Sequence, residues 1–269
     1  METNSLYTAL IANNPDLKDR LDTNSIITAY RGSVAHNLYI EPEHEFSTDD
    51  VDIISIGIPE KHFYFPVNKS LVSKDSITTY IDSFDIVWYE FVKAMSMMTQ
   101  CNPNLLPMLW LNDEHYIKVS RWGELLIANR DAFASRLNVY NAFTGYARQQ
   151  IDRLQRGATD ASYMGAKRRA LVEEYGYDTR YAAHAIRLFK MGIEYLLTGK
   201  LNVFRESDRE ELISIKQGKL PLEYVKEYAI ELEEVAKESV LMSVLPDAPD
   251  FEWIQKFTTN CVLDALARK

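Results

Sequence analysis

The sequence pattern changes once along the chain, near residue 125, and no other feature constrains the fold as strongly. Before this point, short apolar runs typical of β-strands alternate with turns and helical segments. Beyond it, each segment has the apolar spacing of a helix. We therefore predict an α+β domain over residues 1–125, built on a mixed sheet flanked by helices, and an all-α domain over residues 126–269.

Apolar periodicity and the residues that interrupt it define the individual elements. In the first domain the pattern predicts strands over 25–30, 51–58 and 83–87, and helices over 5–21, 88–99 and 105–111. In the second domain it predicts helices over 131–155, 162–175, 178–198, 208–217, 221–242 and 250–268. Gly157 and Gly199 mark helix ends, and Pro246 and Pro249 separate the last two helices.

Composition and charge narrow the class of protein. Hydrophobic residues make up 46% of the chain, which is typical of a globular protein. A net charge of -9 argues against a surface coated with positive charge for nonspecific nucleic-acid binding. Cys101 and Cys261, the two cysteines, are expected to be buried thiols in a reducing cytoplasm. We expect no signal peptide in the first twenty residues and, without about 18 consecutive apolar residues, no membrane span.

The first candidate for chemistry is the pair of acids in Asp50-Val51-Asp52, at the start of a predicted strand. Residues two apart on a strand point to the same face, so these two carboxylates lie side by side. Adjacent carboxylates raise each other's pKa unless a cation lies between them, and Mg²⁺ prefers such hard oxygen ligands. Asp49 points to the opposite face by the same alternation. Exposed acids at a strand start are common, so the pair alone is a weak signal.

Two further features strengthen the prediction. Arg31-Gly32-Ser33 follows a strand directly, and a glycine there allows backbone N–H groups and a hydroxyl to cradle a phosphate. Asp85 lies in the middle of an apolar strand, where a charge is unfavourable unless it is paired or bound to metal. If this strand lies beside 51–58, Asp85 completes a cluster of three acids. Asp82 is a rival for that role.

Glu90 is better placed to begin the following helix, where an acid favours the helix dipole. No metal-ligand spacing relates His36, His44, His62 and His115, and the chain has no Walker A, G-x-S-x-G or G-x-G-x-x-G motif.

The order of strand, Gly-Ser, strand with Asp-x-Asp, and strand with a third Asp resembles the DNA polymerase β-type nucleotidyltransferases. The resemblance implies a nucleotidyltransferase-type sheet and two Mg²⁺ ions. It implies that Gly32 and Ser33 bind phosphate, and that Asp50, Asp52 and Asp85 are the catalytic metal ligands. The loop 34–49 is longer than usual in that family and is a candidate insertion over the site.

More of the chain resembles one branch of that family, the RNA-repair-associated (RlaP-like) group. The similar segments are FDIVWYEFVKAMSMMTQCNPNLLPMLW and YGYDTRYAAHAIRLFKMGIEYLLTGKL. The resemblance covers most of residues 25–220.

The predicted helix 178–198 has two distinct faces at 3.6 residues per turn. Its core stripe consists of Ala182, Ile186, Phe189, Ile193 and Leu196, and its other face carries Arg180, His184, Arg187 and Met191. This second face is either a solvated basic surface or the wall of a cleft that binds phosphates or a base, and we favour the cleft. Planar guanidinium groups suit phosphate.

Lys167-Arg168-Arg169 forms a second basic cluster, and we assign Lys167 to the nucleotide site with Arg180, His184 and Arg187. Tyr146 and Arg148 are weaker candidates, more typical of packing and surface positions.

Together these features predict a Mg²⁺-dependent enzyme that moves a nucleoside monophosphate from a nucleoside triphosphate, such as ATP, to an acceptor hydroxyl and releases pyrophosphate. The resemblance suggests an RNA end as acceptor, while a protein hydroxyl or a small molecule stays open. Two other classes also stay open: an Asp-x-Asp glycosyltransferase that uses sugar nucleotides, and a non-catalytic nucleotide-binding module.

Overall fold

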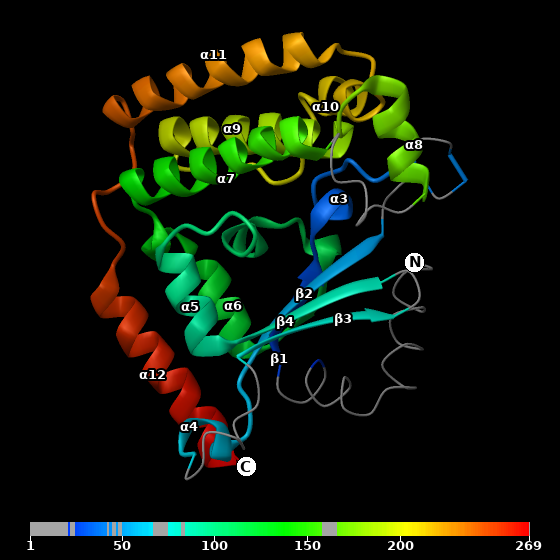
Figure 1. Cartoon of the computed structure of the whole chain (residues 1–269). Helices are drawn as coiled ribbons and strands as arrows, with labels where there is room; N and C mark the ends of the chain where they lie inside the picture. Colours follow the sequence, from blue (N-terminus) through cyan, green and yellow to red (C-terminus); the bar gives the residue numbers. More distant parts are fainter. Residues whose placement is uncertain are drawn as a thin grey trace.

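A computed structural model describes residues 21, 25–41, 43–44, 47, 50–66, 75–81, 84–157 and 166–268, with only the backbone of 81, 155–157 and 166–167. A β-sheet with short helices forms the N-terminal part, and a layer of long helices lies over it (Figure 1). The predicted α+β class is therefore confirmed. The predicted helix 5–21, apart from Leu21, and the acids Asp49 and Asp82 lie outside the described residues.

The sheet has five strands in the order β3-β4-β2-β1-β5. The central pair, β2 with β4, is parallel, and the other three pairs are antiparallel. The strands are β1 (Ser25–Tyr30), β2 (Val51–Gly57), β3 (Ser76–Ile81), β4 (Phe84–Glu90) and β5 (Tyr116–Val119).

Strand alternation divides the apolar side chains of the sheet between two clusters. Ile53 and Trp88 belong to a small cluster on one face, while Ile54 and Ile56 belong to the large core beneath the helices. Residues two apart share a face, so Asp52, two positions before Ile54, points to the side that the helices cover. The sheet thus places an acid at the edge of the main core.

Strand β4 is longer than predicted, and the predicted helix start at Trp88 is wrong. Residues 88–90 continue the ladder with β2, because Trp88 is 2% exposed and packs in the small cluster. Helix α5 (Phe91–Thr99) begins one residue after Glu90, whose carboxylate accepts hydrogen bonds from the N–H groups of Val92 and Lys93. Glu90 therefore starts this helix, as predicted, by capping its free N–H groups.

Strands β3 and β5 were not predicted, and both lie at the edges of the sheet. Exposed residues such as Thr78 and Tyr80 alternate in β3, and all four residues of β5 are half-buried. Edge strands that bury little apolar surface leave a weak periodic signal in the sequence.

The remaining helices match most of the predicted positions. The segment 105–111 forms a 3₁₀ helix, Leu106–Trp110, and the short helices α4 and α6 were not predicted. The bounds are α3 (Gly32–Ala35), α4 (Lys61–Tyr64), α6 (Arg121–Ala128), α7 (Arg136–Gly157), α8 (Ala166–Tyr175), α9 (Thr179–Thr198), α10 (Arg209–Lys216), α11 (Leu222–Leu241) and α12 (Phe251–Arg268). Within the described ranges, no helix is long and apolar enough to span a membrane.

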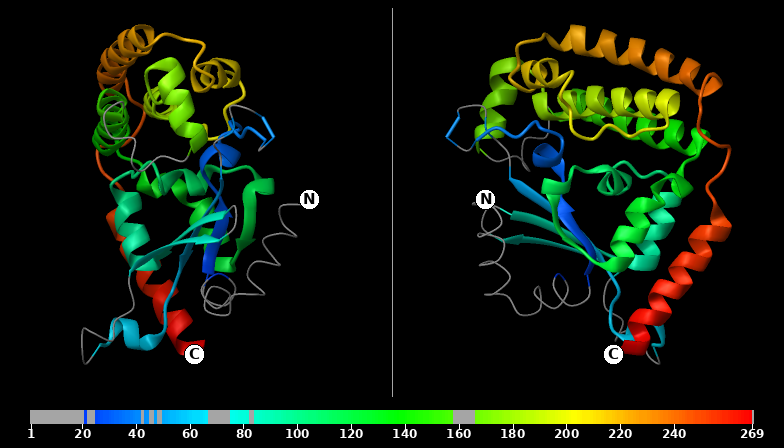
Figure 2. Two further views of the ribbon diagram at one scale, coloured as in Figure 1. Left: turned by 45° about the vertical axis from the view of Figure 1, so that its right-hand side comes forward. Right: turned by 180° about the vertical axis from the view of Figure 1, so that it is seen from behind.

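Helix α9 is the centre of the helical layer, where it packs against α7, α10 and α11 (Figure 2). Helix α12 instead leaves this layer and runs beside α5 and α6 (Figure 1). Its Phe257 ring stacks on Trp253 with centroids 4.8 Å apart and meets Trp122 edge-on at 5.5 Å. The indole Nε1 of Trp122 donates to Asp264 Oδ2 over 2.7 Å. The last helix thus stabilises the N-terminal part.

The Glu90 cap provides a test of local stability. The buried carboxylate also accepts a 2.6 Å hydrogen bond from the Tyr64 hydroxyl, so Glu90→Ala leaves three donors without their acceptor. We expect the free energy of unfolding, measured by urea denaturation, to fall by about 1–3 kcal/mol. Glu223→Ala in the exposed first turn of α11 is the control, with an expected change within about 0.5 kcal/mol. Equal stabilities of the two variants would contradict this account of the cap.

Candidate active site

Two acids meet in the middle of the sheet because β2 and β4 are parallel. The pairing sets Asp52 directly opposite Asp85, and alternation turns both carboxylates toward the helical layer. Burial raises the pKa of each carboxyl above its ordinary value, and the nearby Arg31 guanidinium opposes this effect. The charge of Asp85 raises the pKa of Asp52 further, as does that of Asp50. A bound cation would relieve this repulsion.

Asp50 is exposed at the start of β2, and its charge also raises the pKa of Asp85. The three predicted acids therefore lie close enough to influence one another. Their side chains are not gathered into a preformed cage: among the described residues, no group of three or more His, Cys, Asp or Glu side chains is arranged to hold a metal ion.

Arg31 takes part in this cluster, which the sequence interpretation did not predict. Its Nη2 donates to Asp85 Oδ2 over 2.9 Å and lies 3.3 Å from Asp52 Oδ1. Its backbone N–H donates to the carbonyl of Asp52 over 2.9 Å, which fixes the end of β1 against β2. The one indication of this role in the sequence is that Arg31 directly precedes Gly32-Ser33. We interpreted that turn as a phosphate-binding site and gave Arg31 no part in it.

Gly32 begins α3 with a φ of +61°, a conformation that favours glycine. A Cβ atom added there would lie 2.0 Å from Oδ2 of Asp52. The glycine therefore makes room for the carboxylate, beyond the phosphate role that we predicted for it. Ser33, the next residue, lines the cavity described below.

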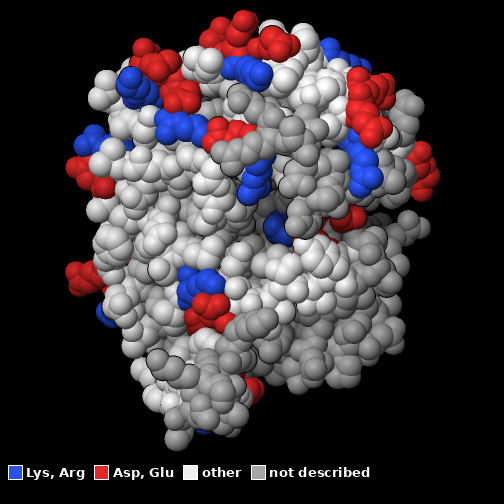
Figure 3. All heavy atoms as spheres, viewed as in Figure 1, with Lys and Arg blue, Asp and Glu red and all other residues white. Residues whose placement is uncertain are grey.

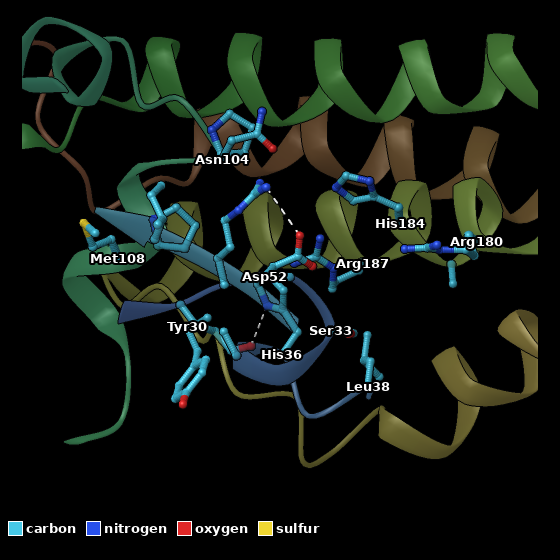
Figure 4. A pocket seen from close by; sticks show the side chains of 18 of the residues that line it. Tyr30, Ser33, His36, Leu38, Asp52, Asn104, Met108, Arg180, His184 and Arg187 are labelled. Atoms are coloured by element: carbon cyan, nitrogen blue, oxygen red, sulfur yellow. Dashed lines mark hydrogen bonds and ion pairs between the residues drawn. The ribbon is translucent and has the colours of Figure 1, made fainter. Parts of the chain in front are cut away.

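A cavity of about 270 Å³ opens beside Asp52, between the sheet and helix α9. Figure 4 shows Arg180, His184 and Arg187 on one wall of it, with Ser33 close to Asp52. The structure thus brings together six predicted residues in one cavity: Gly32, Ser33, Asp52, Arg180, His184 and Arg187. Asp50 and Asp85 lie outside its lining, and the side chain of Lys167 lies outside the described residues.

The side chain of Arg187 is buried, at 8% exposure. Burial and the charge of Arg205 lower its pKa to about 9, so it is still a cation at neutral pH, and Asp208 and Asp52 oppose the shift. Among the described residues, its Nη1 donates to the sulfur of Met191, over 3.6 Å. A buried guanidinium with such a weak acceptor, facing a cavity, is suited to bind an anion.

The structure also places the other residues that were singled out on α9 and on α7. Burial, together with the nearby Arg187 and Arg180, holds the pKa of His184 well below its ordinary value, so this imidazole is neutral. Met191 lies in the core, 0% exposed, and does not line the cavity. Tyr146 accepts a hydrogen bond from Asn102 and Arg148 pairs with Glu233 at the surface, as expected of packing and surface residues.

The segment after α3 is tied to the helical layer by several hydrogen bonds, which the sequence did not predict. His36 Nδ1 lies 2.9 Å from the Val203 carbonyl, and Lys216 Nζ donates to the Leu38 carbonyl over 2.8 Å. Arg209 Nε donates to the carbonyl of Asn37 over 2.9 Å. Two of these residues, His36 and Lys216, also line the cavity. The helical layer therefore holds the Gly32-Ser33 turn in place.

Residues 44–259 match the RNA repair pathway DNA polymerase beta family (RlaP), and the chain belongs to that family. It is thus an enzyme of the polymerase β-type nucleotidyltransferase class, which carries out nucleotidyl transfer. No curated protein matches the chain. Among solved structures, it is similar to a nucleotidyltransferase-like protein from Exiguobacterium sibiricum 255-15. The identity is 11% and the TM-score 0.29, over 86% of this chain and 75% of that one.

Gly32→Ala tests the close approach of this turn to Asp52. The new Cβ would collide with the carboxylate and would strain a positive φ, so we expect loss of activity and a stability loss of about 1–3 kcal/mol. Gly145→Ala is the matched control, because nothing lies within 4 Å of its Cβ position in helix α7. That variant should be active and as stable as the wild type or more so. Wild-type turnover by Gly32→Ala would contradict the assigned packing.

Proposed function

We propose that this enzyme transfers a nucleoside monophosphate from a nucleoside triphosphate to an acceptor hydroxyl with the help of Mg²⁺. One observation carries the proposal: Asp52 and Asp85 lie side by side on parallel strands, and Asp52 lines a cavity whose wall carries arginines. The acids suit divalent cations and the arginines suit a polyphosphate.

The residues fit a bound metal on three counts. Carboxylate oxygens are the hard ligands that Mg²⁺ prefers. Asp85 Oδ1 is buried and has no hydrogen-bond partner among the described residues, so its lone pairs are available to a metal ion. Burial and mutual repulsion raise the pKa of Asp52, an effect that a cation would reverse. Asp52, Asp85 and Asp50 would hold two ions.

In the reaction, the acceptor oxygen bonds to the α-phosphorus, the bond from that phosphorus to the bridging oxygen breaks, and pyrophosphate leaves. Mg²⁺, when bound, lowers the pKa of the attacking hydroxyl and neutralises the leaving group. The Asp85 carboxylate, in register with Asp52, would assist removal of the hydroxyl proton. Arg187, Arg180 and Lys216 balance the charge of the phosphates, while the Ser33 hydroxyl donates to them. We also propose Lys167, on α8, as a further phosphate contact.

Neutral His184 suits a different part of the nucleotide. It lies between Arg180 and Arg187 on the cavity wall, and an uncharged imidazole can both donate and accept hydrogen bonds. We assign it to the ribose or the base, with ATP as the first nucleotide to test.

We propose an RNA end as the acceptor, because the description of the matching family refers to an RNA repair pathway. On the face shown in Figure 3, acidic and basic side chains are interspersed over the helical layer, which favours a docked end over long nonspecific contacts. A protein hydroxyl or a small molecule is an alternative outcome of the test below. We place the enzyme in the cytoplasm, in keeping with two free, buried cysteines.

A glycosyltransferase with Asp-x-Asp needs neither the Gly32-Ser33 turn nor Asp85, and the family membership argues against it. A non-catalytic module would bind a triphosphate tightly without releasing pyrophosphate.

Asp52→Asn tests the proposed reaction. We expect turnover to fall by about a thousandfold or more, because a neutral amide replaces the central metal ligand. The measurement is incubation with each α-labelled nucleoside triphosphate and Mg²⁺, with bulk RNA or without an acceptor. Asp113→Asn, at an exposed position that does not line the cavity, is the control and should transfer label normally. Label transfer by Asp52→Asn at the wild-type rate would overturn the assignment of the metal site.

Arg187→Lys tests the phosphate wall. Lysine keeps the positive charge but loses the planar fork that grips two phosphate oxygens. We expect KM for the triphosphate to rise by about tenfold with a smaller change in kcat. Arg148→Lys, at the surface pair with Glu233, should leave both constants unchanged. An unaltered KM in Arg187→Lys would remove Arg187 from the nucleotide site.

A further inference from the structure

The Arg31 guanidinium lies between the two acids and contacts both of them. A single nitrogen, Nη2, lies 2.9 Å from Asp85 Oδ2 and 3.3 Å from Asp52 Oδ1. The side chains involved are only partly exposed, at 27% for Arg31, 21% for Asp52 and 17% for Asp85. Two carboxylates in register with so little solvent need a positive charge beside them, and the chain supplies its own.

The contact is incomplete. Arg31 Nε is buried and has no hydrogen-bond partner among the described residues, and the same holds for Asp85 Oδ1. A guanidinium carries five N–H donors, and a bidentate pair with one carboxylate would be the stronger arrangement. Arg31 instead divides one nitrogen between two acids. Such a contact compensates charge without saturating either partner, so a divalent ion can replace it.

Arg31 also lies close to a second place where it could pair with an anion. It lines the same cavity as Ser33, Arg180 and Arg187, which we assign to the phosphates. Once a metal ion binds Asp52 and Asp85, its charge repels the Arg31 guanidinium. The two carboxylates are then no longer available to pair with Arg31. A triphosphate in the cavity would then be the nearest anion for that group.

We propose that Arg31 is an exchangeable counter-ion: it holds Asp52 and Asp85 when no metal is bound, and it moves to the triphosphate when metal binds. This inference rests on the proposed function, and it adds a residue and a coupling that the function alone does not require. Metal alone has to displace Arg31, whereas metal with nucleotide gives Arg31 a new partner. The two ligands therefore bind with positive cooperativity.

Removal of the guanidinium tests the exchange without any measurement of turnover. We expect Arg31→Gln to bind Mn²⁺, in the absence of nucleotide, about tenfold more tightly than the wild type, because no charge-assisted contact has to be broken. The readout is the electron paramagnetic resonance signal of free Mn²⁺ during titration. The variant should also melt at a lower temperature without metal and gain more from Mn²⁺ than the wild type does. Arg31→Met, which keeps the apolar stem, gives the same test if Arg31→Gln folds poorly.

Arg136→Gln is the matched control, because Arg136 also pairs with an aspartate, Asp247, but at the surface. Its affinity for Mn²⁺ should equal that of the wild type. An affinity of Arg31→Gln and Arg31→Met at or below the wild-type level would overturn the exchange.

Asp52→Asn separates this inference from the proposed function. If Asp52→Asn loses Mn²⁺ binding while the Arg31 variants match the wild type, only the exchange fails. If Asp52→Asn binds Mn²⁺ as the wild type does, the proposed metal site fails and the exchange fails with it. Weaker binding of inorganic triphosphate by Arg31→Gln, at saturating Mn²⁺, is expected of the second half of the exchange, and unchanged binding would overturn that half.

Discussion

The site depends on the parallel pairing of β2 with β4, which sets two carboxylates opposite each other at the border of the main core. Neighbouring acids on a buried sheet repel each other, so the fold has to supply compensation. Arg31 gives part of it through one guanidinium nitrogen. The remaining parts of the site surround this unfavourable pair: a glycine that leaves space for Asp52, and a cavity whose wall carries cations.

This arrangement reconciles an acidic chain with an anionic substrate. The net charge is -9, yet Arg31, Arg180, Arg187 and Lys216 all line the same cavity. Positive charge that is concentrated within low-dielectric walls acts more strongly on a phosphate than the same charge spread over a surface. The protein can therefore attract a nucleotide without a generally basic surface.

Much of the fold was predictable from the sequence, since the long helices and the inner strands bury apolar stripes with a clear period. The proximity of Asp52 and Asp85 was predictable as well, because Asp85 interrupts an apolar strand. The edge strands were not, for they bury little. The role of Arg31 depends on Asp85, 54 positions away, and the contacts of His36 and Lys216 join residues 167 and 178 positions apart. Local periodicity contains no information about such pairs.

The hydrogen bonds between the segment after α3 and the helical layer affect how the enzyme is made. His36, Asn37 and Leu38 emerge early during synthesis, but their partners at Val203, Arg209 and Lys216 emerge only after most of the chain. The sheet can pair its strands before then, while the Gly32-Ser33 turn lacks its supports. The hydrogen bonds that support this turn can thus form only after the acids of β2 and β4 have been synthesised.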